Sequence, residues 1–298
     1  MSKPMYVGAI LRPLIYAITI AAPMTVSAVP GNSLAQEPVK LFSAPGLVQS
    51  SEPLIQGMKA RRAAKDEWPG TLYQQFDAEM CTATFVGPHT LLVAAHCTWS
   101  DQPIEFEFRG RTYRGKCSPH SDFRPWKNEN SAAERKAASF DLALCEITNG
   151  PVQGIKYERI GDLNFSLQVG SPIRVVGFGC NDIYQSTGAG ELRYADLEIT
   201  RAAGQDNYVE TGTLSEGSTT LCAGDSGGAA YVQTGADVYR RVIVAVNSHT
   251  SRKFGKLTGI SYLSSLQSPE AREYLRKWTS GGSHRTICGL NYDAVNCR

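Results

Sequence analysis

The chain has 298 residues, 42% hydrophobic and 19% charged, and is long enough to bury a substantial core in one double-lobed unit or two domains. Its 30 Lys and Arg against 28 Asp and Glu leave a net charge of +2, which argues against a disordered chain, an acidic tail or a strongly basic nucleic-acid binder. The eight Cys include no C-x-x-C pair, which argues against a zinc ribbon, and paired Cys would indicate an oxidising compartment.

The amino-terminal segment is typical of an export signal. Lys3 and Arg12 flank the start of an uncharged stretch, 13–36, which contains the apolar run 14–22 and then small residues in two cleavage-site patterns. Pro and Gly interrupt the stretch before the roughly 20 apolar residues that a membrane helix needs, so a retained anchor is the less favoured alternative. We expect residues 1–35 to be a signal peptide and the mature protein to be secreted, extracellular or periplasmic, and free of the membrane.

The next segment, 36–53, has Ser and Pro turn signals without a clear period, which is typical of a propeptide or linker. We place the folded domain at 54–279 and a carboxyl-terminal tail with a local Cys pair at 280–298.

Strand signals dominate the folded part. Residues 104–109 alternate apolar with charged side chains, as a half-buried strand does. Further strand-like segments lie at 90–95, 173–176, 197–200 and 242–246. They are separated by Gly, Asn and Pro clusters at short intervals, which predicts a mostly antiparallel β sandwich or barrel rather than βαβ units.

A helix is predicted near the carboxyl end. Ser268 is a suitable N-cap and Pro269 a suitable first helical residue. Apolar side chains then recur at helical spacing, at Ala271, Tyr274, Leu275 and Trp278. This pattern predicts an amphipathic helix packed on the body. The polar stretch 127–138 predicts an exposed loop or a short helix.

The sharpest short motif is GDSGG at 224–228, because glycines let the backbone turn tightly, expose the Ser226 hydroxyl and direct N–H groups toward one point. Serine is a weak nucleophile without a base and a group that orients the base. His96 ends an apolar run, and Asp141 opens the apolar segment DLAL. Each residue alone is more often a turn or surface residue, but the three together predict nucleophilic catalysis.

The order of these residues along the chain separates two enzyme folds. A Gly-x-Ser-x-Gly string also fits the nucleophile elbow of an α/β-hydrolase, but that fold places its acid and base after the serine. Here His96 and Asp141 precede Ser226. The order and the β-rich pattern favour a double-barrel serine protease.

Over 54–278 the sequence resembles the trypsin/chymotrypsin family of serine proteases in three motifs, VAAHC around His96, DLAL at Asp141 and GDSGG around Ser226. The resemblance implies an all-β fold of two six-stranded antiparallel barrels with a carboxyl-terminal α-helix. It implies an endopeptidase that works through an acyl-enzyme, with Ser226 as nucleophile, His96 as general base and then acid, and Asp141 orienting the imidazole. The N–H groups of Gly224 and Ser226 would form the oxyanion hole.

The same resemblance implies protein or peptide substrates, with protein inhibitors as further partners. The enzyme is expected to be a monomer and to need no cofactor. No nucleic acid is expected. No metal is expected either, because the five His are scattered and form no spaced pair suited to zinc.

Activation in the family requires a cut that frees an apolar amino terminus, whose ammonium ion pairs with the Asp before the nucleophile, here Asp225. The matching start is 54–57, LIQG, but Pro53 precedes it where the family has Arg or Lys, and Gln56 replaces a glycine. The hypothesis is therefore that a protease of another type cleaves the zymogen before Leu54.

Eight Cys allow 105 pairings. The resemblance implies Cys81 with Cys97. Placement along the expected strands and loops indicates three further pairs, Cys117 with Cys145, Cys180 with Cys222, and Cys288 with Cys297.

The pocket for P1, the residue before the cleaved bond, is expected around Thr220, Leu221, Ser248, His249 and Thr250. Relatives that cleave after Lys or Arg have an Asp where this chain has Thr220. A cationic side chain would be buried without a partner, so an uncharged P1 is expected. His249 could instead favour an acidic P1, although a polar His at a pocket rim is more often inert.

Two other functions remain open. A protease homologue that binds without cutting would normally have lost catalytic residues, and all three are present. A serine esterase would use the same acyl-transfer chemistry.

Overall fold

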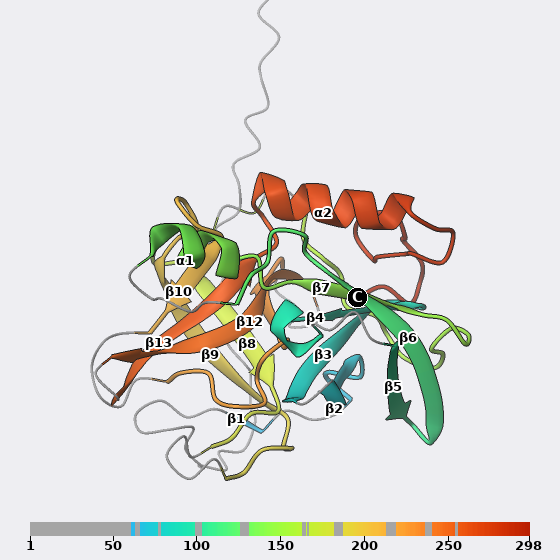
Figure 1. Cartoon of the computed structure of the whole chain (residues 1–298). Coiled ribbons are helices and arrows are strands. Elements are labelled where there is room, and N and C mark those ends of the chain that lie inside the picture. The colour runs from blue at the N-terminus through green and yellow to red at the C-terminus, as the bar shows by residue number, and fades with distance from the viewer. Residues whose placement is uncertain are drawn as a thin grey trace, which may run out of the picture. The chain divides into compact units, whose positions relative to one another are not determined.

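The computed structural model describes residues 61–62, 66–76, 79–98, 103–125, 131–162, 165, 167–181, 187–212, 219–235, 240–253 and 256–298 (Figure 1). The expected signal peptide, the propeptide and the new amino terminus at Leu54 lie outside the described residues.

The first barrel is formed by six antiparallel strands in the order β2-β3-β4-β7-β6-β5. They are β2 (Thr71–Phe76), β3 (Glu79–Gly87), β4 (Thr90–Val93), β7 (Ala143–Ile147), β6 (Arg111–Pro119) and β5 (Pro103–Phe108). The two edge strands, β2 and β5, approach each other. In β5 the side chains of Ile104 and Phe106 are buried and those of Glu105 and Glu107 are exposed, as the alternating sequence predicts.

The second barrel has the order β1-β9-β10-β13-β12-β11-β8, and β8 also pairs with β9, which closes a ring of six. Its strands are β1 (Arg61–Arg62), β9 (Arg193–Arg201), β10 (Tyr208–Thr211), β13 (Lys256–Ser265), β12 (Arg241–Lys253), β11 (Ala229–Gln233) and β8 (Pro172–Gly177). The predicted fold class of two six-stranded antiparallel barrels is confirmed, and the two-residue β1 is an addition.

Helix α2 (Pro269–Ser280) begins where the sequence predicts. Ser268 Oγ accepts a hydrogen bond from the N–H of Ala271, and Ala271, Leu275 and Trp278 are buried against the body. The Tyr274 hydroxyl accepts from the N–H of Leu144 in β7, so the helix is bound to the first barrel. Within the described residues no helix is long and apolar enough to cross a membrane.

A short helix, α1 (Ala132–Ala138), occupies the end of the polar stretch and leads into Asp141. Arg135 on this helix forms ion pairs with Asp206 and Glu210 of the second barrel. The segment that bears Asp141 is thereby attached to both barrels.

The tail after α2 packs on the first barrel. The N–H of Cys288 donates to the carbonyl of Val86 at 2.7 Å, and the N–H of Tyr157 donates to the carbonyl of Asn296 at 2.8 Å. The four disulfides are Cys81–Cys97, Cys117–Cys145, Cys180–Cys222 and Cys288–Cys297, which are the pairs expected from the sequence. The last of them closes this tail on itself.

Candidate active site

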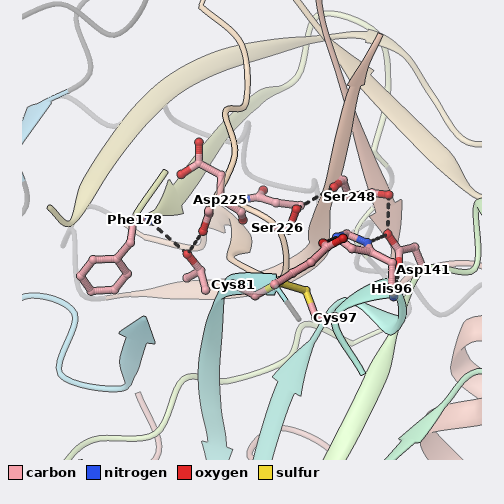
Figure 2. Close-up of a disulfide and its surroundings, with 12 residues drawn as sticks. Cys81, His96, Cys97, Asp141, Phe178, Asp225, Ser226 and Ser248 are labelled. Atoms are coloured by element: carbon pink, nitrogen blue, oxygen red, sulfur yellow. Dashed lines mark hydrogen bonds and ion pairs between the residues drawn. A yellow bond between two sulfur atoms is a disulfide. The ribbon is translucent and has the colours of Figure 1, made fainter. Parts of the chain in front are cut away.

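His96 lies in a single 3₁₀ turn (Ala95–Cys97) that directly follows the buried strand β4. The next residue, Cys97, is joined to Cys81 of β3 (Figure 2). The strand and the disulfide hold both sides of the turn, while the His96 side chain itself remains 26% exposed. The local sequence thus presents an imidazole to solvent from a rigid support.

Asp141 is bonded to His96 and to Ser248. Its Oδ2 accepts from His96 Nδ1 at 2.6 Å and from the Ser248 hydroxyl at 2.6 Å, while Oδ1 accepts from the His96 backbone N–H at 2.8 Å (Figure 2). Asp141 is only 2% exposed. A buried carboxylate that accepts three hydrogen bonds holds the ring in one orientation and leaves Nε2 free to exchange a proton.

The charges of this pair stabilise each other. Burial alone raises the pKa of Asp141, but the charge of His96 and the hydrogen bonds from His96 and Ser248 outweigh burial and lower it. Burial likewise lowers the pKa of His96, whereas Asp141 and, more weakly, Glu79 raise it, and the net pKa lies above the ordinary 6.5. Asp141 is therefore ionised at neutral pH, and it favours the protonated imidazole.

Ser226 lies in a tight loop that the first barrel supports. Gly224 has a φ of +99°, which favours glycine. Thr82 of β3 donates its hydroxyl to the Gly224 carbonyl at 2.6 Å and its N–H to the Ser226 carbonyl at 2.8 Å. Both carbonyls are turned toward Thr82, so the loop is bound to the barrel that carries His96.

The Ser226 hydroxyl donates to the carbonyl of Ser248 at 3.2 Å. Among the described residues, the Ser226 hydroxyl is thus bonded to Ser248 and not to His96 (Figure 2). Hydrogen bonds between a nucleophile and its base are often absent or long in the unliganded state and form when substrate binds. For that bond to form, Ser226 Oγ would have to turn from Ser248 toward His96.

The carboxylate of Asp225 is buried beneath the same loop. It accepts from the N–H of Gly179 at 2.7 Å and from the N–H of Cys222 at 2.9 Å, and a Cβ on Gly179 would overlap it. Burial raises the pKa of Asp225 to about 6, although these bonds and the charge of Arg193 lower it. Leu54, its expected partner, is outside the described residues.

A cavity of about 430 Å³ joins these groups between the two barrels. His96, Asp141 and Ser226 all line it. Of the expected pocket residues, it is lined by Leu221, Ser248, His249 and Thr250. Further apolar walls come from Phe123, Pro125, Ala138 and Tyr208.

Thr220 is placed differently from the other expected pocket residues. It is 5% exposed, its hydroxyl lies 3.1 Å from the Ser261 hydroxyl, and it borders a separate small cavity that Asp225 and Arg193 also line. The described walls of the large cavity do not include Thr220. Leu221, whose side chain is apolar, takes that place.

His249 is held among aromatic rings. It stacks on Tyr262 with ring centroids 4.6 Å apart and meets the edge of Tyr208 at 5.3 Å. Burial lowers its pKa to about 4, although the charge of Asp141 raises it. The ring is therefore neutral at physiological pH and offers no positive charge to an acidic substrate side chain.

Three features of the site were not foreseen from the sequence. Ser248 was expected in the pocket wall, and its hydroxyl also binds Asp141. Thr82 bonds to the nucleophile loop across the two barrels, and Tyr208 forms part of the cavity wall. No local pattern marks such residues, because each acts through a partner distant in sequence.

One close group of potential metal ligands occurs among the described residues, formed by Cys81, His96 and Cys97. Both sulfurs are in a disulfide. Metal coordination by cysteine requires the thiolate, so this group does not fit a metal ion.

Comparison with known proteins relates the chain to one family. A family model described as Trypsin matches residues 55–264. Among solved structures the chain is similar to neuropsin, a serine protease expressed in the limbic system of mouse brain, with a TM-score of 0.54 and 18% identity. The alignment covers 73% of this chain and 97% of neuropsin. At this identity the likeness concerns the fold.

Proposed function

The chain belongs to the trypsin family of serine proteases, whose substrates are proteins or peptides, and we propose that it is an active secreted endopeptidase. The observation that carries the proposal is the bonding of Asp141 to His96 and Ser248 beside Ser226 in one cavity. The four disulfides support export, because disulfides persist in oxidising compartments.

In the proposed reaction Ser226 Oγ attacks the substrate carbonyl while His96 Nε2 takes the hydroxyl proton. The negative oxygen of the tetrahedral intermediate is stabilised by the N–H groups of Gly224 and Ser226. The C–N bond then breaks, and the leaving amine takes the proton from Nε2. Water then attacks the acyl carbon while Nε2 takes its proton. The ester bond to Ser226 Oγ breaks, and Oγ recovers the proton from Nε2.

Asp141 contributes without reacting itself. Its Oδ2 at 2.6 Å from Nδ1 keeps that nitrogen protonated in the neutral ring, so Nε2 is the basic atom. When Nε2 takes the proton, the buried carboxylate stabilises the imidazolium. Ser248 contributes by donating to the same oxygen, which favours the charged form of Asp141.

An uncharged P1 side chain fits the proposed pocket. The described wall is formed by Leu221, Ser248, the neutral His249 and Thr250. The acid that lines the described cavity, Asp141, is already bonded to His96 and Ser248 and does not serve as a partner for Lys or Arg. Burial of an unpaired cation would cost several kcal/mol.

Labelling with a phosphonate and hydrolysis of casein test the proposal together. Wild-type protein should be labelled and should cleave casein, and Ser226→Ala should do neither. Glu107→Gln, an exposed change in β5, serves as the control that retains both. A protein that is labelled and hydrolyses esters but leaves casein intact would be an esterase. A folded protein without labelling would be a binding homologue, and either result contradicts the proposal.

A further inference from the structure

Glu79 lies beside His96, which lines the active-site cavity. It begins β3, and because side chains alternate along a strand, it shares a face with Cys81. Cys81 is bonded to Cys97, the residue after His96. This geometry places Glu79 Oε2 3.9 Å from His96 Nε2, and the Glu79 side chain is 65% exposed.

The two ring nitrogens of His96 face different carboxylates. Nδ1 is bonded to the buried Asp141, and the proposed mechanism explains this bond because Asp141 orients the ring. Nε2 is the atom that exchanges protons with Ser226 and with the leaving amine. An exposed carboxylate beside Nε2 is not required for either transfer, so Glu79 needs another explanation.

The proposed reaction assigns this side of the cavity to the leaving group. Leu221, Thr250 and the nucleophile loop border the part that receives P1. The leaving amine must face Nε2 to receive its proton. The residue that the amine begins, P1′, therefore extends past Nε2, where the Glu79 carboxylate lies.

Resting on the proposed function, we infer that Glu79 selects substrates with Lys or Arg at P1′. Its carboxylate can pair with a cationic side chain that extends from the leaving amine. Within the described part of the chain, His96 lies at ion-pair distance from Glu79, and a substrate cation would take this place. Because the Glu79 side chain is exposed to solvent, this pairing should raise kcat/KM by only about two- to fivefold. The gain should decrease as the salt concentration rises.

The charge of Glu79 also raises the pKa of His96, so this effect has to be separated from a contact with the P1′ side chain. Removal of its charge should move the acid limb of kcat/KM to lower pH for every substrate, since Glu79 and Asp141 both favour protonated His96. A subsite contact, in contrast, changes the ratio between substrates that differ only at P1′. The ratio is therefore the decisive readout.

The experiment uses peptides with one apolar P1 and with Lys, Arg, norleucine or Glu at P1′. Norleucine retains the apolar stem of Lys without its charge. Wild-type enzyme should favour Lys and Arg over norleucine by about two- to fivefold at low salt and should disfavour Glu. Glu79→Gln should bring these ratios close to one, whereas Glu107→Gln, an exposed change in β5, should keep the wild-type ratios.

Two results would overturn the inference. Glu79→Gln could retain the wild-type ratio, so that any change through the acid limb affects all substrates equally. Wild-type enzyme could also show no cationic preference at P1′. In each of these cases wild-type protein that cleaves peptides and reacts with a phosphonate still supports the proposed function, so the two failures are distinguishable.

Discussion

His96 and Asp141 are joined by two hydrogen bonds that use different atoms of each residue. The ring Nδ1 lies 2.6 Å from Oδ2, and the backbone N–H lies 2.8 Å from Oδ1. The first bond fixes the orientation of the ring, and the second fixes the carboxylate relative to the turn that carries the ring. The buried carboxylate is thus positioned by the same residue that it orients.

Asp141→Asn should reduce kcat by about 10⁴-fold with little change in KM. The amide can retain the bond from the backbone N–H, but its NH₂ group facing Nδ1 would favour the wrong tautomer of His96. Steady-state kinetics on protein quantified by phosphonate titration measure the change. Asp293→Asn, whose side chain is 77% exposed in the tail, is the control and should retain wild-type kcat. A loss below tenfold would contradict the role of Asp141.

The preference at P1 should not turn toward acidic residues as the pH falls from 8 to 6. His249 has a pKa of about 4, mainly because of burial, and it stays neutral over this range. Substrates with Glu and Gln at P1 have nearly the same shape, so the ratio of their kcat/KM values reports charge recognition alone. We expect a ratio below one that is constant with pH. A ratio that rises as the pH falls would show that His249 becomes a cation in the pocket.

Most of the fold could be predicted because its signals are local. The alternation at 104–109 predicted β5, and the N-cap at Ser268 with apolar residues at helical spacing predicted α2. The three short motifs predicted that His96, Asp141 and Ser226 would meet, and they line one cavity. Each motif is a few residues long, so composition and order suffice to find it.

The rest of the site depends on contacts between distant segments. The Ser248 hydroxyl reaches Asp141 across 107 positions, and Thr82 reaches Gly224 across 142. Which face of β12 or β3 meets the partner depends on strand register, including a register shift between Asn247 and His249 in β12. Burial on both faces hides that register in the sequence.

Gly179→Ala should destabilise the protein and reduce activity, because a Cβ at this position would overlap the Asp225 carboxyl group. The carboxylate would have to move away from the N–H groups of Gly179 and Cys222, and the Ser226 loop would move with it. We expect a loss of about 1–3 kcal/mol in the free energy of unfolding. Gly204→Ala is a matched control, since no atom lies within 4 Å of its added Cβ. Equal stability of the two variants would contradict this account.

The charge state of Asp225 should make the stability of the unprocessed protein depend on pH. Its pKa in the folded protein is about 6, above the ordinary 3.8, so this group takes up a proton more readily in the folded state. The protonated carboxyl group adds about 3 kcal/mol to the free energy of unfolding. This contribution is complete below pH 3.8 and is lost as the pH rises through 6. Urea unfolding of unprocessed Ser226→Ala between pH 4 and 7 measures the slope, and Asp225→Asn in the same background isolates the share of this carboxylate.

Cleavage before Leu54 should abolish that slope between pH 4 and 7 if the new ammonium ion pairs with Asp225. An ion pair depresses the pKa of the carboxyl group below its ordinary value. The contribution of Asp225 would then be present above pH 3.8 and lost as the pH falls through the depressed pKa. Between pH 4 and 7 the contribution of Asp225 should therefore fall with rising pH in the unprocessed form and stay nearly constant in the processed form, and Asp225→Asn should remove this difference. Two forms with the same slope would show that the freed terminus does not pair with Asp225.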